Sequence, residues 1–380
     1  MPTIRKGKPF MKKLFALLLA AVMLLGMMSF ASAEDIKVAM ITDYGDITDQ
    51  SFNQTTYEAA KAFCDANGIE FQYYKPASDS DTDRISSIEN AIDDGYNVII
   101  MPGYAFAKAI VGTVEENPEA TFIALDVSEY DLQDAHGTAD DFSWVYPSNL
   151  YSAVYQEELC GYMAGYAAVK LGYKKLGFLG GMAVPAVVRY GYGFVQGADA
   201  AAAELALTDV EIKYVYGNQF YGDADITAYM DTWYANGTEI VFACGGGIFT
   251  SAGEAASKVG GKVIGVDVDQ AGTIDGMYGE GITVTSAMKG LAATVNAELA
   301  AVKDGAFVGG KVENLGLVSD TPEDNFVQIA PSTQFADGFT ADDYAALVVK
   351  MHAGDITVSD ATDVEPAVTA VTVTYFDNIK

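Results

Sequence analysis

The chain has 380 residues, of which 50% are apolar and 19% are charged, so it can bury the cores of two domains. It carries 52 acidic against 22 basic side chains, a formal net charge of −30. Such a charge repels phosphate backbones, and no basic stripe in the sequence offsets it. Nucleic acid is therefore excluded as a partner.

Residues 1–33 have the composition of a signal peptide. Lys12 and Lys13 precede the apolar stretch 14–30, and three small residues, 31–33, form a cleavage site. We expect cleavage after about Ala33 and export to the periplasm or the cell surface. The alternative is a transmembrane anchor, which requires about twenty apolar residues with no cleavage motif after them. No cysteine lies near this site, so we expect no lipid anchor of the usual kind.

The stretch 43–53, DYGDITDQSFN, follows a short apolar run that predicts a buried strand. Ser51 and Gln54 have the spacing of a capping box and predict the start of a helix. A strand, a polar loop containing glycine and a capped helix form the crevice in which open α/β sheets bind ligands. The loop is therefore a candidate binding site.

Three side chains of this loop suit a flat, polar ligand. Asp43 offers acceptors, Phe52 offers an apolar face, and Asn53 offers both a donor and an acceptor. Asp49 offers further acceptors. The structural alternative is that the two aspartates shape a turn and that Phe52 fastens the helix to the core.

Strand-like and helix-like stretches alternate along the rest of the chain. The predicted strands are 36–41, 70–75, 97–101 and 121–125 in a first series, and 176–179, 211–216, 240–243 and 262–266 in a second. Alternation of this kind predicts a parallel, doubly wound sheet in each series. The fold class is therefore α/β, with two lobes of similar design.

The last part of the chain is expected to return to both lobes. A strand at 282–286 and a helix at 288–303 could rejoin the first sheet, while 312–330 and a helix at 340–351 would complete the second. The predicted domains are an N-terminal lobe, 34–173 plus 281–309, and a C-terminal lobe, 174–280 plus 310–380. A cleft between two such lobes suits closure on a small molecule.

The second lobe also places polar and glycine-rich loops after its strands. Aromatic residues lie at 189–194, glycines at 245–247 and acids at 267 and 269, and the segment 286–289 supplies a lysine. Glycines let a backbone approach a ligand closely, although a tight turn explains them equally well. No phosphate-binding GxxxxGK[ST] pattern occurs, so a nucleotide is a poor candidate.

The chain has little material for metal binding or nucleophilic catalysis. It contains three cysteines (Cys64, Cys160, Cys244) and two histidines, without the spacing of a zinc site or of a Ser/His or Cys/His pair. The odd, sparse cysteines predict no disulfide framework. Catalysis by carboxylates alone stays open at this point.

Several ordered stretches resemble one known family. They are 41–54 (ITDYGDITDQSFNQ), 157–165 (EELCGYMAG), 178–182 (FLGGM), 263–270 (VIGVDVDQ) and 285–289 (TSAMK). They resemble the blocks of the basic membrane protein family, also called the purine nucleoside receptor family. Its members are extracytoplasmic binding proteins of nucleoside ABC importers, with the two-lobed periplasmic-binding-protein fold of the first type.

The resemblance implies a set of ligand-binding residues. Phe52 and Tyr190 would stack on the base, although Phe194 is an alternative because the family usually has Phe where this chain has Tyr190. Asn53 and Asp43 would face the base or the sugar. The remaining implied residues are Asp126, Gly246, Asp267 and Lys289, of which Asp267 and Lys289 would hold ribose hydroxyls. Many members are lipoproteins, and this chain departs from them in lacking the lipid-acceptor cysteine.

We therefore expect a nucleoside-binding protein, with a purine nucleoside as the expected ligand, that works as a monomer with a membrane permease and has no catalytic residues, metal or cofactor. A binding protein for a sugar or another polar metabolite is the alternative within this class. An exported carboxylate-dependent nucleoside hydrolase is the alternative from another class. A sensor input protein shares the fold and differs only in its partner.

Overall fold

The computed structural model describes residues 36–43 and 45–380. The signal peptide predicted over 1–33 lies outside these residues. Within the described part of the chain, no helix combines the length and the apolar character needed to cross a bilayer.

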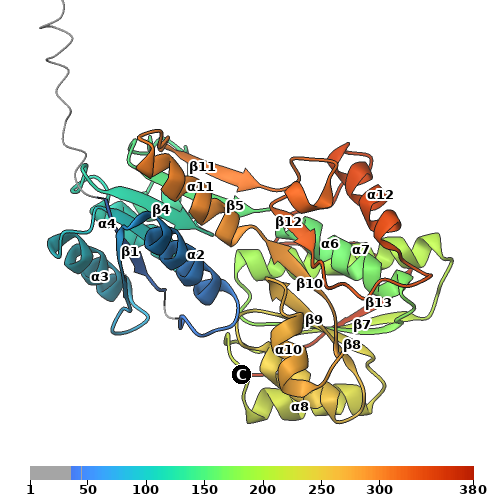
Figure 1. Ribbon diagram of the computed structural model, residues 1–380. Coiled ribbons are helices and arrows are strands. Elements are labelled where there is room, and N and C mark those ends of the chain that lie inside the picture. Colours follow the sequence, from blue (N-terminus) through green and yellow to red (C-terminus); the bar gives the residue numbers. More distant parts are fainter. Residues whose placement is uncertain (1–35, 44) are drawn as a thin grey trace, which may run out of the picture. The chain divides into compact units, whose positions relative to one another are not determined.

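The first of two sheets has six strands in the order β11-β5-β4-β3-β1-β2, and all of its pairs are parallel (Figure 1). Its strands are β1 (Lys37–Ile41), β2 (Glu70–Tyr74), β3 (Val98–Pro102), β4 (Thr121–Leu125), β5 (Leu150–Tyr155) and β11 (Lys311–Leu315). β3, with the sequence VIIMP, is buried at every residue. A central strand of a parallel sheet is covered on both faces, which is why such strands read as continuous apolar runs.

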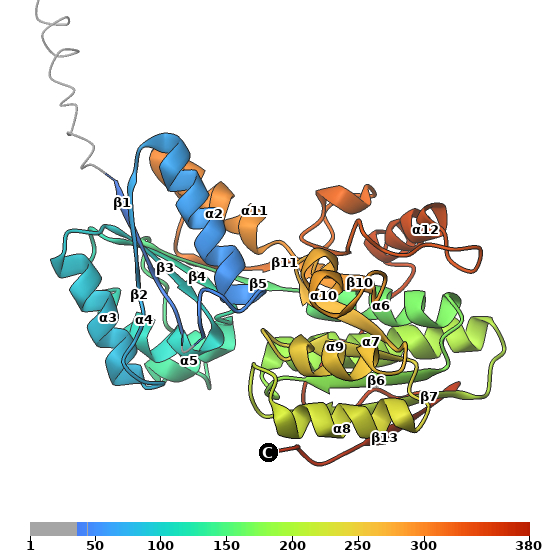
Figure 2. The ribbon, with the colours of Figure 1, turned by 60° about the horizontal axis from the view of Figure 1, so that its bottom comes forward.

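Helices cover both faces of this sheet. α2 (Phe52–Asn67) and α11 (Leu291–Lys303) contact each other on one face. On the other face lie α3 (Asp81–Asp93), α4 (Ala107–Thr113) and α5 (Glu129–His136), with the short η1 (Tyr104–Phe106) before α4 (Figure 2). The predicted parallel, doubly wound sheet is confirmed for this lobe.

The second sheet has seven strands in the order β12-β10-β9-β8-β6-β7-β13, and only β10 and β12 pair antiparallel. Its strands are β6 (Lys175–Gly180), β7 (Val210–Tyr216), β8 (Ile240–Cys244), β9 (Lys262–Asp267), β10 (Thr283–Lys289), β12 (Val327–Ile329) and β13 (Val371–Tyr375). The mostly parallel sheet that the alternating pattern predicted is thus confirmed here as well.

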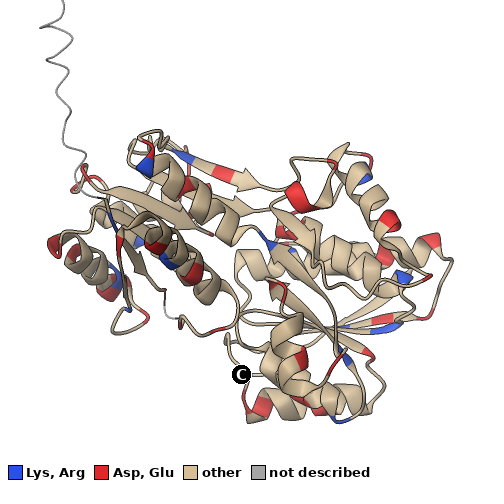
Figure 3. Ribbon diagram, viewed as in Figure 1, with Lys and Arg blue, Asp and Glu red and all other residues tan. Residues whose placement is uncertain are grey.

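Helices flank the second sheet in the same way. Figure 1 shows α6 and α7 on one side of the sheet and α8 on the other. These helices and their neighbours are α6 (Glu157–Lys170), α7 (Pro185–Glu204), α8 (Ala224–Ala235), α9 (Phe249–Ser257), α10 (Ala271–Tyr278), η2 (Pro322–Asp324) and α12 (Ala341–His352). Acidic residues are spread over helices and loops around both sheets, with basic residues interspersed among them (Figure 3).

The late strands do not belong to the sheets that the sequence suggested. β10 pairs with β9 in the second sheet, and β11 pairs with β5 in the first. The prediction that 282–286 rejoins the first sheet, and that the strand beginning near 312 stays in the second, is therefore wrong. β10 is buried at six of its seven residues, as expected of an inner strand, but burial alone does not show which strands pair with it. The domain limits 34–173 plus 281–309 and 174–280 plus 310–380 stay a prediction.

The chain passes between the two sheets three times, and the crossing segments are hydrogen-bonded to one another. The Gln156 N–H donates to the Leu315 carbonyl, the Phe326 N–H to the Gly316 carbonyl, and the Gly290 N–H to the Phe326 carbonyl. Short crossing segments of this kind are where two lobes hinge, since few backbone angles have to change.

α6 and α7 pack with their backbones in close contact. A Cβ at Gly161 would lie 2.2 Å from the Tyr190 carbonyl oxygen, and a Cβ at Gly193 would lie 2.1 Å from the Glu158 carbonyl oxygen. Gly165 and Gly197 are equally crowded by the facing helix. This close packing fixes α6 against α7 and so sets the positions of the side chains at their first turns.

Gly193→Ala should therefore destabilise the fold by about 1–3 kcal/mol, because the added methyl group forces the two helices apart. Denaturant unfolding of the ligand-free protein measures the loss. Gly272→Ala in α10 is the matched control, since a Cβ there meets nothing within 4 Å. The control should change the free energy of unfolding by less than about 1 kcal/mol, in the stabilising direction. Equal losses in both variants would contradict the packing argument.

Candidate ligand-binding site

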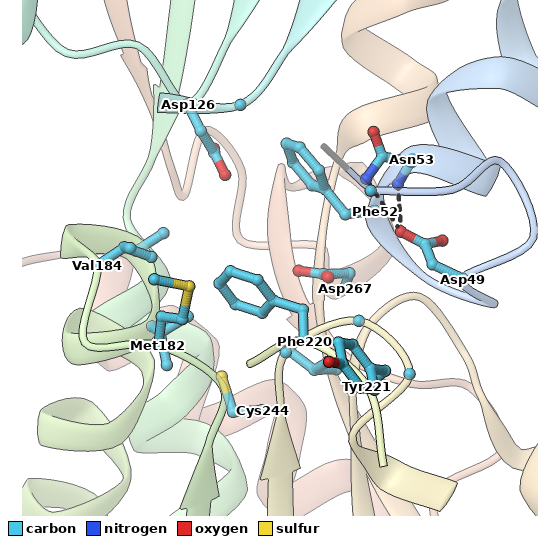
Figure 4. Close-up of a pocket in the computed structure, with 18 of the residues that line it drawn as sticks. Asp49, Phe52, Asn53, Asp126, Met182, Val184, Phe220, Tyr221, Cys244 and Asp267 are labelled. Atoms are coloured by element: carbon cyan, nitrogen blue, oxygen red, sulfur yellow. Dashed lines mark hydrogen bonds between the residues drawn. The ribbon is translucent and has the colours of Figure 1, made fainter. Parts of the chain in front are cut away.

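One large pocket, with a volume of about 1000 Å³, lies where the loops after β1, β4, β8 and β9 meet (Figure 4). This is the carboxyl edge of both sheets, where open α/β sheets bind ligands. All the residues that the sequence analysis selected line it: Asp43, Phe52, Asn53, Asp126, Tyr190, Gly246, Asp267 and Lys289.

The helix that starts at this pocket is capped differently from the sequence prediction. The Asp49 carboxylate accepts hydrogen bonds from the backbone N–H groups of Ser51, Asn53 and Gln54, at 2.9, 2.9 and 3.0 Å. The Ser51 hydroxyl makes no capping bond to the helix and donates instead to Asp267 Oδ2, at 2.6 Å. The predicted Ser51–Gln54 capping box is therefore wrong. A carboxylate is the stronger acceptor for these N–H groups, and it frees the serine to join the loop to β9.

Asn53 lines the pocket, and its side-chain amide is held by Asp49. Its Nδ2 donates to Asp49 Oδ2 at 3.2 Å, while Oδ1 is buried and has no hydrogen-bond partner within the described residues. Burial raises the pKa of Asp49 above its ordinary value, against the lowering effect of its backbone hydrogen bonds. Beside Asn53, Asp43 Oδ1 accepts the Gly45 N–H at 2.6 Å.

A buried cluster of charges adjoins the pocket, and three of its members, Asp126, Asp267 and Lys289, line it. Lys289 Nζ lies 2.5 Å from Asp126 Oδ2, 3.2 Å from Glu157 Oε1 and 3.9 Å from Asp267 Oδ1. The second oxygen of Glu157 accepts from Arg189 Nε at 2.7 Å. The cluster thus combines three carboxylates with two cations. Its remaining negative charge favours a neutral ligand over an anion.

The pKa values of the cluster follow from burial and from these neighbours. Burial raises the pKa of Asp126 to about 6, although Lys289 acts in the opposite direction. Burial also acts to raise the pKa of Glu157, but Arg189 and Lys289 outweigh it and hold that pKa below its ordinary value. Burial acts to lower the pKa of Lys289, and the surrounding carboxylates more than offset it, so that the amine stays charged.

Two acidic residues of the cluster occupy an unfavourable backbone conformation. Asp126 has φ 63° and Asp267 has φ 65°, both in the left-handed region. Residues other than glycine seldom adopt this backbone conformation, and it persists only where the surrounding structure holds the backbone in place. Here they aim two carboxylates at one pocket. Gly246 has φ 51°, and a Cβ there would lie 2.8 Å from the Phe220 carbonyl oxygen, so only glycine suits this position.

The pocket holds a pair of aromatic rings that the sequence analysis only half identified. In Figure 4 the rings of Phe52 and Phe220 project into the same space from different sides. Tyr190 also lines the pocket, but it is 1% exposed, and its hydroxyl donates to Asp267 Oδ1 at 3.2 Å. Phe194 is fully buried against Phe242 and is not part of the lining.

Three functional candidates were therefore missed. Phe220 lies in the loop after β7, Glu157 begins α6, and Arg189 lies in the first turns of α7. A signal existed for Phe220, because the loop 217–222, GNQFYG, follows a strand and contains two aromatics between glycines. Glu157 and Arg189 are recognisable only once their ion pair is seen.

A second set of contacts joins the loop 43–53 to α10 at the edge of the pocket. Gln270 Nε2 donates to the Gln50 carbonyl oxygen at 3.0 Å, and the Thr273 hydroxyl donates to Gln50 Oε1 at 3.4 Å. Gln270 is 1% exposed, and its Oε1 accepts from the Val266 N–H. These bonds tie the loop after β1 to the second sheet.

Several known proteins are similar to this chain in sequence or in fold. The chain is 26% identical over 300 residues to the "ABC transporter nucleoside-binding protein BmpA" of Lactococcus lactis, and the aligned region covers 74% of this chain and 79% of that protein. It is 30% identical over 250 residues to "Basic membrane protein B" of Borreliella burgdorferi, covering 63% and 67%. A solute-binding protein of an ABC transporter system from Conexibacter woesei matches the fold with a TM-score of 0.65 at 22% identity, over 86% of this chain and 99% of that one.

Residues 36–328 match the family described as "ABC transporter substrate-binding protein PnrA-like". This match covers the whole first sheet, most of the second and every residue of the pocket named above, and it confirms the resemblance seen in the sequence. The chain belongs to this family, Bmp, of ABC transporter substrate-binding proteins, which are not enzymes.

Proposed function

We propose that this substrate-binding protein carries a nucleoside to the membrane permease of an ABC importer. The observation that carries the proposal is that two phenylalanine rings, those of Phe52 and Phe220, line the same pocket as the buried carboxylates of Asp126 and Asp267. A nucleoside has two matching parts: a flat base that suits the rings and a neutral sugar whose hydroxyl groups suit the carboxylates. The printed name of the Lactococcus lactis relative supports this ligand class.

The base would lie between Phe52 and Phe220. Both rings are half-buried without a ligand and gain contact area when a flat ligand enters between them. Lys289 Nζ lies 4.7 Å from the centroid of the Phe52 ring, which orients that ring beside the charged cluster. We assign the second face to Phe220 rather than to Tyr190, because the Tyr190 ring is already covered by protein.

The sugar would lie against the charged cluster. Asp126 Oδ1 is buried without a hydrogen-bond partner within the described residues, although Oδ2 of the same group holds Lys289. A buried acceptor without a partner costs free energy unless a ligand supplies a donor. The hydroxyl groups of a ribose are donors of this kind, and Asp267, whose Oδ1 lies 3.9 Å from Lys289 Nζ, would accept a second one.

A free sugar or another polar metabolite is the alternative ligand, because its hydroxyls would suit the same carboxylates. The two phenylalanine rings that line the pocket favour the nucleoside, because a flat base can contact both of them. The export signal over 1–33 and a monomeric state belong to the proposal as well. The family itself is one of extracytoplasmic binding proteins, which implies a small-molecule ligand and a permease partner.

The decisive experiment identifies the ligand directly. Mass spectrometry of small molecules released by denaturing the purified protein should detect a nucleoside. Calorimetry with the refolded, ligand-free protein should then show binding of guanosine, adenosine or inosine without conversion to the free base. Heat with a sugar and none with any purine or pyrimidine nucleoside would overturn the proposal.

Phe52→Ala and Phe220→Ala should each weaken nucleoside binding by about 1–3 kcal/mol, the usual cost of losing one stacking partner. Both rings line the pocket, so the melting temperature of the ligand-free protein should change little. Phe71→Ala is the matched control, because this half-buried ring of β2 lies outside the pocket and packs on Tyr57. It should leave affinity unchanged. A several-degree loss of melting temperature in Phe52→Ala, with affinity intact, would make Phe52 a core residue.

A further inference from the structure

The loop 217–222, which carries the Phe220 ring to the pocket, buries little of its own surface. Tyr221 is 62% exposed, and Asn218 is exposed as well and has φ 61°, in the left-handed region. A loop with few buried apolar contacts opens at a low cost in free energy. The position of the Phe220 ring therefore depends on the contacts that other segments make with this loop.

The first of these contacts come from glycine backbone. A Cβ at Gly181 would lie 2.4 Å from Phe220 Cδ1, and a Cβ at Gly245 would lie 2.9 Å from the same atom. The Gly247 N–H donates to the Phe220 carbonyl oxygen at 2.8 Å. These contacts support the ring from the ends of β6 and β8.

A second support comes from the segment 376–380. It follows β13, which pairs along β7 at the edge of the second sheet, and it reaches the start of α8 (Figure 2). The Ile379 side chain is half-buried and packs against the apolar core beneath α8 and α9. The family match stops at 328, so the segment lies outside it.

Consecutive residues of the segment 376–380 hold both ends of the Phe220 loop. The Ile379 N–H donates at 2.9 Å to the carbonyl oxygen of Tyr216, the last residue of β7. Lys380 Nζ pairs with Oδ2 of Asp223, which directly precedes α8. The same oxygen accepts from Gln219 Nε2 at 2.9 Å, within the loop itself. The lysine therefore supports the carboxylate that keeps the loop folded.

We propose that Ile379 and Lys380 are positioning residues for ligand binding, which hold the loop 217–222 so that the Phe220 ring is in place before a ligand enters. Neither residue lines the pocket, so the effect is transmitted by Phe220. A ring that is already ordered spares the entropy that binding would otherwise cost. The inference rests on the proposed function, in which Phe220 stacks on the base, and it extends the binding machinery to a segment outside the family match.

The first test compares Lys380→Met with a chain that ends at Asn378 and so also lacks the Ile379 N–H. Calorimetry uses whichever of guanosine, adenosine and inosine binds the unmodified protein most tightly. Both variants should bind it about 3- to 10-fold more weakly, the factor expected when one more side chain has to be ordered on binding. Lys380→Arg should bind normally, because a guanidinium group can also pair with Asp223.

The matched control is a lysine at the other end of the same strands. Lys174 pairs with Asp209 at 2.9 Å, just before β6 and β7 begin, so Lys174→Met should leave affinity unchanged. Normal affinity in Lys380→Met would overturn the inference and leave the proposed function intact. This variant alone decides the question if the shortened chain does not fold.

The second test asks whether the effect is transmitted by Phe220. In a Phe220→Ala protein, Lys380→Met should change affinity by less than about 2-fold, since no ring is left to position. A loss of the same size with and without Phe220 would show that Lys380 acts on the fold as a whole, and would overturn the inference. Absence of binding of any nucleoside to the unmodified protein would instead overturn the proposed function on which the inference rests.

Discussion

Replacing Lys289 with methionine should lower the free energy of unfolding of the ligand-free protein by about 3–5 kcal/mol, the usual cost of removing one partner from a buried ion pair. Lys289 pairs with three carboxylates, those of Asp126, Glu157 and Asp267. Glu157 keeps Arg189, but the other two would face each other in a buried pocket without a counter-charge. Methionine preserves most of the side-chain volume, so the loss reports on charge rather than on a cavity.

The loss in Lys289→Met should depend on pH. Burial raises the pKa of Asp126 to about 6 even with the lysine present, and removing the lysine takes away the charge that opposes this rise. A carboxyl group with a raised folded-state pKa binds its proton more tightly when folded, so its stability is present at low pH and is lost as the pH rises through the folded-state pKa. The deficit should therefore be smaller at pH 5 than at pH 8.

The control for this prediction is a lysine on the surface. Lys258 pairs with Asp231 and Glu254 and is half exposed, so Lys258→Met should change the free energy of unfolding by less than about 1 kcal/mol at either pH. Chemical denaturation of both variants at the two pH values gives the comparison. Similar losses in both, or a Lys289→Met deficit that does not grow with pH, would mean that the cluster is not held together by Lys289.

The sequence was most informative where a strand ends. Asp43, Asp126, Gly246 and Asp267 each end a parallel strand or follow one closely, and the carboxyl ends of parallel strands meet at one edge of the sheet. Placing the strands was therefore sufficient to place these residues together. Which lobe supplies which strand does not alter this result, and so the exchange of β10 and β11 left the predicted lining intact.

Contacts between distant segments could not be read in the same way. The ion pair of Glu157 and Arg189 joins the starts of two helices whose separation is set by the facing glycines of α6 and α7. Ser51 matched a capping box in its local sequence, yet its hydroxyl is bound by an aspartate 216 residues away. Local patterns give the available donors and acceptors. The tertiary fold decides which of several possible hydrogen-bond partners each side chain contacts.

The charged cluster also adjoins the segments that cross between the lobes. Glu157 follows the crossing residue Gln156, and Lys289 precedes the crossing residue Gly290. A ligand that contacts Lys289 therefore acts one residue away from a hinge. Ligand binding and lobe closure would be coupled directly, because Glu157 and Lys289 are each bonded to a residue of a crossing segment. Hinge closure around a ligand requires such a connection between the site and the hinge.

Asp267→Asn should weaken ribonucleosides strongly and 2′-deoxynucleosides much less. Asp267 ends β9, is 5% exposed, and accepts from the Ser51 hydroxyl and the Tyr190 hydroxyl at 2.6 and 3.2 Å. Its lone pairs leave room for ribose hydroxyls on the pocket side, and each bond to the charged group contributes roughly 1.5–3 kcal/mol. A 2′-deoxynucleoside lacks the 2′-hydroxyl that would donate to the carboxylate, so the substitution weakens its binding less.

Guanosine and 2′-deoxyguanosine, measured by calorimetry on the unmodified protein and on Asp267→Asn, form a double-mutant cycle that isolates this bond. Asp269→Asn makes the same chemical change two residues further on, at an exposed carboxylate that bonds Ser332 outside the pocket, and it should bind both ligands normally. A coupling free energy near zero would mean that Asp267 does not touch the 2′-hydroxyl. Equal weakening of both ligands would then show that Asp267 acts by holding Ser51 and Tyr190 in place, because both bonds are made without a ligand.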